Sequence, residues 1–204
     1  MSAIRKVSSA ICIAGERYHP AMDDTAHILG VVGSSGSGKT HLLARLIRRL
    51  TERGLSVSTL KHAHHNFDVD IPGKDSHTHR MAGASEVIVS SSRRWVHMHE
   101  IGEGAEATLA QLLRRLSPCD LVLVEGFKGE CHPKLEVYRP SVGKPPLYPD
   151  DPRIVAVASD QALDARVPVV SLDDTDAVAE LALARSEPLV SVIAALEASK
   201  ASNR

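Results

Sequence analysis

The stretch Gly33-Ser34-Ser35-Gly36-Ser37-Gly38-Lys39-Thr40 fills every fixed position of the phosphate-loop pattern G-x-x-x-x-G-K-[ST]. An apolar run at 28–32 precedes it and is typical of a buried strand, while apolar residues at helical spacing follow between 42 and 50. A glycine-rich turn between strand and helix directs successive backbone N–H groups and the helix dipole at one point. We therefore expect these eight residues and the adjoining His41 to bind a nucleoside triphosphate. Lys39 should contact the β- and γ-phosphates in binding and catalysis, and Thr40 should hold Mg²⁺.

Composition favours a compact domain and excludes some partners. The chain has 204 residues, of which 43% are hydrophobic and 24% charged, close to globular averages. A net charge of −1 predicts no bulk attraction to nucleic acid or to an anionic membrane. Three widely spaced cysteines without a C-x-x-C pair predict neither a disulfide framework nor a zinc knuckle. No apolar stretch approaches the length of a membrane span, and the N-terminus makes a poor signal peptide, so we expect a cytoplasmic protein.

Alternating strand and helix patterns predict an α/β fold: a P-loop NTPase-like three-layer sandwich with a mostly parallel central sheet. Residues 1–26 precede the first core strand and are interpreted as an arm of unknown role, and 27–204 as the nucleotide-binding domain. The segment 140–152 holds five prolines and is interpreted as a loop or lid. Strands are expected at 28–32, 57–61, 87–89, 95–98, 121–124, 135–138, 154–158 and 167–171, with 87–89 and 95–98 paired antiparallel. Helices are expected at 39–53, from a cap at Asp75 or Ser76 to about 83, at 109–116, from a cap near 174, and from a start at 186–188.

An acidic residue follows the most apolar expected strand. Leu121-Val122-Leu123-Val124 should lie inside the sheet, and Glu125 ends it. An acid at this place in a phosphate-loop protein holds Mg²⁺, usually through a water, or polarises the attacking water. We therefore assign Glu125 a metal-side and catalytic role, against the alternative of an acid that simply meets solvent.

A histidine-rich segment follows the second expected strand. Five of the eleven histidines fall between positions 62 and 79, after Lys61, which we expect to contact the nucleotide. His62, His64 and His65 are suitable metal ligands, but their spacing matches no standard zinc template, which favours a structural or phosphate-contacting role. Asp68 and Asp70 alternate, so both face one side of an extended segment, toward Mg²⁺ or away from it. We assign Asp68 to the metal.

The motifs together resemble one family. The phosphate loop, KHAHHNFDVDIPGKDSHTHRMAGA at 61–84, LVLVEGFK at 121–128, PKLEVYR at 133–139 and IVAVASD at 154–160 are similar to molybdopterin-guanine dinucleotide biosynthesis protein B (MobB). The similarity runs from about 28 to 176 in the same motif order. It implies a homodimeric GTP-binding protein with weak GTPase activity. Such a protein assists the MobA-like guanylyltransferase that joins GMP to molybdopterin, with molybdopterin as a candidate shared ligand.

The sequence also offers a residue that could select the nucleotide base. Asp160 ends a strand, where its carboxylate could accept hydrogen bonds from N1 and N2 of guanine, although Ser-Asp is also a common turn pair.

A small-molecule kinase or a GTP-driven metal chaperone would also suit a phosphate loop beside histidines, and the family resemblance decides against both. We expect slow turnover, since no arginine finger is evident beside the loop. Arg80 and Arg93 are the candidates that a dimer could supply.

Overall fold

The computed structural model describes residues 25–63 and 67–202. Most of the arm expected at 1–26 lies outside these residues, and Ala26 is buried in the core. The strands are β1 (His27–Val32), β2 (Val57–Lys61), β3 (Glu86–Ser90), β4 (Trp95–His99), β5 (Leu121–Glu125), β6 (Lys134–Tyr138), β7 (Ile154–Ser159), β8 (Val169–Ser171) and β9 (Glu187–Pro188). The helices are α1 (Lys39–Glu52), α2 (Asp75–Met81), α3 (Leu109–Leu113), α4 (Thr175–Arg185) and α5 (Leu189–Ser202), with a 3-10 turn at Pro140–Val142.

The central sheet has seven strands, with the order β2-β5-β1-β6-β7-β8 and β9 paired with β1. Every neighbouring pair along this order is parallel, and β9 alone runs antiparallel to its partner. The expected mostly parallel sheet is therefore confirmed. Because parallel strands end at the same edge, the segments after β1, β2, β5, β6 and β7 come together there, where ligands of open α/β sheets bind.

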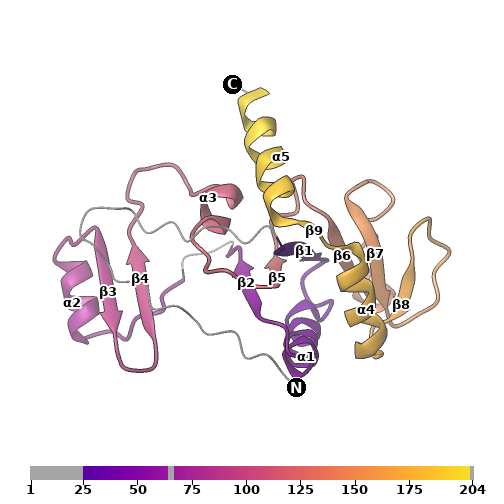
Figure 1. Ribbon diagram of the computed structural model, residues 1–204, viewed down its shortest axis with the longest axis horizontal. Helices are drawn as coiled ribbons and strands as arrows, with labels where there is room; N and C mark the ends of the chain where they lie inside the picture. Colours follow the sequence, from indigo (N-terminus) through magenta and orange to yellow (C-terminus); the bar gives the residue numbers. More distant parts are fainter. Residues whose placement is uncertain (1–24, 64–66, 203–204) are drawn as a thin grey trace, which may run out of the picture.

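Side chains alternate across the sheet and build two cores. From β1 and β5, Leu29 and Leu123 face the core that α1 and α4 cover. Ile28 and Val122 face the opposite core, which α3 and α5 cover. Figure 1 shows these helix pairs on opposite sides of the sheet, which confirms the three-layer sandwich. Within the described ranges, no helix is both long and apolar enough to cross a membrane.

The β3–β4 hairpin differs from the expected sheet in its position. The two strands pair antiparallel as expected, but they form their own two-stranded sheet, with α2 beside it and apart from the central sheet (Figure 1). Val87 and Met98, opposite one another, are the buried side chains of the hairpin. Strands inside a parallel sheet are buried on both faces, whereas most apolar side chains of this hairpin are exposed.

Some element boundaries also differ from expectation. The helix start placed at 186–188 is wrong, because Glu187–Pro188 pairs with β1 and α5 begins at Leu189, whose N–H donates to Ala26 O. Helix α2 has Lys74 at its N-cap, and Asp75 is its first residue rather than its cap. Helix α3 ends at Leu113, short of the expected 116. The cap expected near 174 is confirmed, since the Asp174 carboxylate accepts the N–H of Ala177.

Candidate functional site

The phosphate loop joins β1 to α1 in a conformation that requires glycine. Gly33 has φ +145°, and a Cβ there would lie 2.3 Å from the carbonyl oxygen of Val137 in β6. Gly38, at the N-cap of α1, has φ +93°, in the left-handed region that other residues avoid. The chain is thereby pressed against β6 and then turned into the helix. The buried Ser37 hydroxyl has no hydrogen-bond partner among the described residues.

The Lys39 side chain turns back over the loop. Its Nζ donates to the carbonyl oxygens of Gly33, at 3.1 Å, and Ser34, at 2.8 Å. Burial lowers the pKa of this amine, the nearby Lys128 lowers it further, and Glu125 opposes the effect. The ammonium group therefore lies where an anion would stabilise it. Lys128 was missed as a site residue, although it lies three positions after Glu125 in a quoted motif.

Thr40, Lys61 and Glu125 meet beside the loop. The Thr40 hydroxyl donates to Oε1 of Glu125 over 3.3 Å, and Lys61 Nζ lies 3.3 Å from the same oxygen. The sheet register places Glu125 beside Lys61 of β2 and beside Val31 of β1, and the loop after β1 leads to Thr40 in α1. A hydroxyl and a carboxylate oxygen in contact fit Mg²⁺, which prefers oxygen ligands and keeps several waters beside a nucleotide.

A hollow of about 320 Å³ lies beside the start of α1. The expected nucleotide contact His41 lines it, together with Arg45 and Asp173. Arg139, which follows β6, also lines the hollow and forms an ion pair with Asp160, Nη1 to Oδ2 being 2.7 Å. Arg139 thereby joins Asp160 to this side of the site, and the contact of Asp160 with a base stays a prediction. Arg139 belongs to the motif at 133–139, but it is not among the site residues expected from the sequence.

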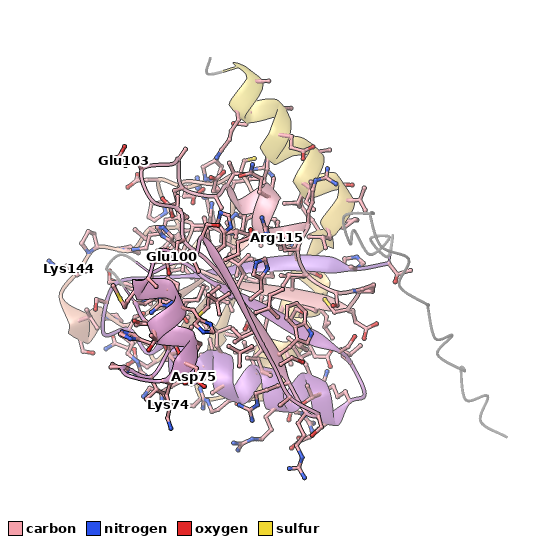
Figure 2. All side chains as sticks on the ribbon, turned by 90° about the vertical axis from the view of Figure 1, so that its left-hand side faces the viewer. Lys74, Asp75, Glu100, Glu103, Arg115 and Lys144 are labelled. Atoms are coloured by element: carbon pink, nitrogen blue, oxygen red, sulfur yellow. The ribbon has the colours of Figure 1, made fainter. Side chains whose placement is uncertain are left out.

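Asp68, the second expected metal residue, is bound elsewhere. Both of its carboxylate oxygens accept from Nη2 of Arg80, at 2.9 and 2.8 Å. The pKa of Asp68 is lowered first by the N–H of Asp70 and then by Arg80. Arg80 also pairs with Asp70 and Glu100, at the α2 and hairpin unit that faces the viewer in Figure 2. The contacts described for Asp68 thus join it to Arg80 and not to Thr40 or Glu125, and its metal role stays a prediction.

The first histidine after β2 is held beside the carboxyl end of β5. The ring of His62 lies 2.8 Å from Oε1 of Glu106, and its centroid is 4.8 Å from that of Phe127. Phe127 has φ +50°, an uncommon value for a residue with a side chain, as found at strained functional sites. His64 and His65 lie outside the described residues. Within the described part of the chain, no three His, Cys, Asp or Glu residues are grouped as a metal site.

Buried polar groups anchor the proline-rich segment that follows β6. The Glu136 carboxylate accepts the N–H groups of Leu147 and Tyr148, and burial raises its pKa despite these bonds. The ammonium of Lys134, buried at 1% exposure, lies 3.1 Å from the Asp151 carboxylate. These contacts favour the interpretation of residues 140–152 as a fixed loop rather than as a lid.

Comparisons with known proteins agree on one family. Residues 28–160 match the family "Molybdopterin guanine dinucleotide synthesis protein B" (MobB). The chain is 41% identical to the molybdopterin-guanine dinucleotide biosynthesis adapter protein of Escherichia coli (strain K12), over 75% of this chain and 89% of the relative. It is 44% identical to the protein of the same name from Haemophilus influenzae, over 70% and 80%. A crystal structure of molybdopterin-guanine biosynthesis protein B is similar at 30% identity and a TM-score of 0.61, over 77% of this chain and 97% of that one.

Proposed function

The chain belongs to the family of molybdopterin guanine dinucleotide synthesis protein B, and on that premise we propose that it is a GTP-binding adapter of this synthesis. In this role it binds GTP with Mg²⁺, hydrolyses it slowly, and assists the MobA-like guanylyltransferase that joins GMP to molybdopterin. Molybdopterin is then a ligand that the two proteins share, and the site of action is the cytoplasm.

One observation carries the nucleotide part of the proposal. A phosphate loop with a lysine turned back over it lies directly beside a threonine–glutamate pair: Lys39 and Thr40 begin α1, and Glu125 ends β5. Lys39 supplies positive charge, while Thr40 and Glu125 supply oxygen ligands. Phosphate loops and Mg²⁺-bound nucleotides need these three groups together.

The loop residues act by holding and neutralising the phosphates. A triphosphate would offer Lys39 charge-assisted hydrogen bonds, which are shorter and stronger than its present bonds to neutral carbonyls. It would also compensate the burial that lowers the pKa of Lys39. Thr40 and Glu125 would hold Mg²⁺, whose chemistry is to neutralise charge that develops on the phosphate oxygens. Lys61 lies close enough to contact the same oxygens once they are bound.

We expect slow hydrolysis because, among the described residues, neither of the two arginines expected as a finger has a contact with the phosphate loop. Arg80, one of the two expected candidates, is engaged by Asp68, Asp70 and Glu100. Arg93 lies in the turn between β3 and β4. An arginine finger contributes about 10³–10⁵ in rate in related enzymes. We therefore expect turnover well below about 1 s⁻¹, the lower end of the range for kinases.

We assign the homodimer interface to the α2 and β3–β4 unit. Among the described residues, nine of the ten exposed large apolar side chains lie between residues 67 and 101, and the tenth is Val190. Trp95 and Ile88, 66% and 65% exposed, are two of them on the hairpin. Exposed apolar side chains gathered in this way mark an interaction surface. A second copy of the chain would cover it with the same residues.

Calorimetric titration with GTP and with ATP in the presence of Mg²⁺ tests the nucleotide claim. GTP should bind more tightly, because the carboxylate of Asp160 can accept from N1–H and N2–H of guanine, which adenine lacks. Turnover of the bound GTP should be slow and independent of added acceptor molecules. Equal affinity for the two nucleotides, or acceptor-stimulated turnover above about 1 s⁻¹, would favour a kinase instead.

A further inference from the structure

Arg139 joins two parts of the site that are far apart in sequence. Its Nε donates to the carbonyl oxygen of Ser37 in the phosphate loop over 3.1 Å. Its Nη1 lies 2.7 Å from Oδ2 of Asp160, in the turn after β7. The two contacts form a continuous path from the phosphate loop to the candidate base-contacting carboxylate.

The guanidinium group also lies over the end of the loop. A Cβ added to Gly38 would lie 3.6 Å from Nε and 3.9 Å from Nη2 of Arg139, so the group packs against the backbone that begins α1. On its other side it lines the hollow of about 320 Å³ beside α1. With about 30 Å³ per water molecule, this volume equals roughly ten waters and can accept a nucleoside-sized group.

We infer that Arg139 is a positioning residue that couples recognition of the guanine base to the shape of the phosphate loop. The inference rests on the proposed function, since it concerns the same nucleotide. Arg139 holds the Asp160 carboxylate in place for the base and holds the Ser37 peptide in place for the phosphates. Loss of the arginine would therefore weaken selection of the base and not simply remove one positive charge.

The chemistry of arginine suits this task. Its planar guanidinium presents five N–H donors in a fixed fork, so one side chain can serve a carbonyl and a carboxylate at the same time. A carboxylate has about four lone-pair sites, and the described ion pair uses Oδ2. Asp160 thus keeps acceptor capacity for two guanine N–H groups while Arg139 stays bound. Lysine, a single flexible ammonium, cannot hold both partners in one plane.

The test measures the affinities of GTP, ATP and inorganic tripolyphosphate for the wild type and for Arg139→Gln, Arg139→Lys and Asp160→Asn. Arg139→Gln should weaken GTP about tenfold or more, from the loss of charged hydrogen bonds, and should bring the GTP-to-ATP affinity ratio close to one. Arg139→Lys retains the charge and should lower the ratio in the same way. In the Asp160→Asn background, Arg139→Gln should lower the ratio no further, because the two residues act through one contact.

A second arginine in the same hollow supplies the control. Arg45 Nη2 donates to the carbonyl oxygen of Leu172 over 2.6 Å, and no carboxylate of the described residues forms an ion pair with it. Arg45→Gln removes an equal charge and should weaken GTP, ATP and tripolyphosphate alike, with an unchanged ratio. Unfolding temperatures of all variants verify that they are folded. If Arg139→Gln does not fold, Arg139→Lys takes its place in the test.

The outcomes separate this inference from the proposed function. A wild type that prefers GTP, with Arg139 variants that keep its full preference, would overturn the inference and leave the proposed function standing. A wild type without any preference for GTP would overturn the guanine claim and the inference with it. Loss of preference in both Arg139 variants, but not in Arg45→Gln, is the result that we expect.

Discussion

Lys61 Nζ lies 3.3 Å from Oε1 of Glu125, across the ends of two adjacent parallel strands in which these residues are in register. The Thr40 hydroxyl reaches the same oxygen. Strand pairing brings the cation and the carboxylate together at the edge of the sheet, and the start of α1 adds the hydroxyl. An arriving Mg²⁺–nucleotide complex would find the metal-side oxygens together, with a lysine beside them for the phosphates.

The carboxylate of Glu125 should make nucleotide binding depend on Mg²⁺. Glu125→Gln removes the charge and retains the shape, so we expect GTP affinity in Mg²⁺ to fall about tenfold and chelation of Mg²⁺ to have little further effect. Titrations with and without EDTA measure this. Glu103→Gln, at an exposed loop position labelled in Figure 2, is the matched control and should behave as the wild type. A Glu125→Gln protein with the full Mg²⁺ effect would remove Glu125 from the metal site.

The amine of Lys39 should supply much of the phosphate affinity. Charged hydrogen bonds contribute about 1.5–3 kcal/mol each, so Lys39→Ala should weaken GTP by at least about tenfold. The fold should be retained, because the described hydrogen bonds of Nζ go to carbonyls of the loop itself. Lys144→Ala, at an exposed position labelled in Figure 2, controls for general charge effects in the same titration. Unchanged affinity in Lys39→Ala would disprove the assignment of the loop.

The hairpin should hold two copies of the chain together. Trp95→Glu places a charge among exposed apolar side chains, and its desolvation at an interface should shift the protein to monomer in sedimentation experiments. Val190→Glu, at the exposed apolar position outside residues 67–101, should leave the assembly unchanged. A Trp95→Glu protein that sediments like the wild-type dimer would place the interface elsewhere.

His132 should make folding stability fall in mild acid. It is fully buried, and neither ring nitrogen has a hydrogen-bond partner among the described residues. Burial, and then the charge of Lys134, lowers its pKa to about 4, below an ordinary value of 6.5. The unfolded chain therefore binds the proton more readily. The stability that depends on neutral His132 is complete above pH 6.5 and is lost as pH falls toward 4.

At pH 5 the loss amounts to about 2 kcal/mol relative to pH 7, from the linkage between protonation and folding. Denaturant unfolding of the wild type and of His132→Leu at both pH values measures it. The variant should lose less stability between pH 7 and pH 5, whatever its stability at pH 7. Equal losses in the two proteins would show that His132 does not titrate in this way.

Parts of the candidate site that consist of consecutive residues could be predicted from the sequence, because each is recognised from a short motif. The phosphate loop is eight consecutive residues, and Glu125 ends a short apolar run typical of an inner strand. Arg139 could not be found in the same way, because its contact with Ser37 joins residues 102 positions apart. That contact depends on β6 lying beside β1, and strand order is not written in any local pattern.

The misplaced elements have related causes. Glu187 and Pro188 resemble a helix start, but backbone pairing with His27 and Ile28 keeps them extended. The two strands of the β3–β4 hairpin were predicted from their apolar runs and the turn between them, whereas the separation of the hairpin from the central sheet depends on what the remaining strands bury. Asp68 and Asp70 both pair with Arg80 of α2, so they face the same side as their alternation predicts, toward an arginine.

The central claim is that nucleotide bound at the phosphate loop lets this protein assist the guanylyltransferase. The most direct measurement is the rate of molybdopterin guanine dinucleotide formation by that enzyme from molybdopterin and Mg²⁺–GTP. It is measured alone, with the wild-type protein, and with Lys39→Ala. We predict a faster rate with the wild type and no increase with Lys39→Ala. A rate that the wild type leaves unchanged, or that Lys39→Ala raises equally, would contradict the account.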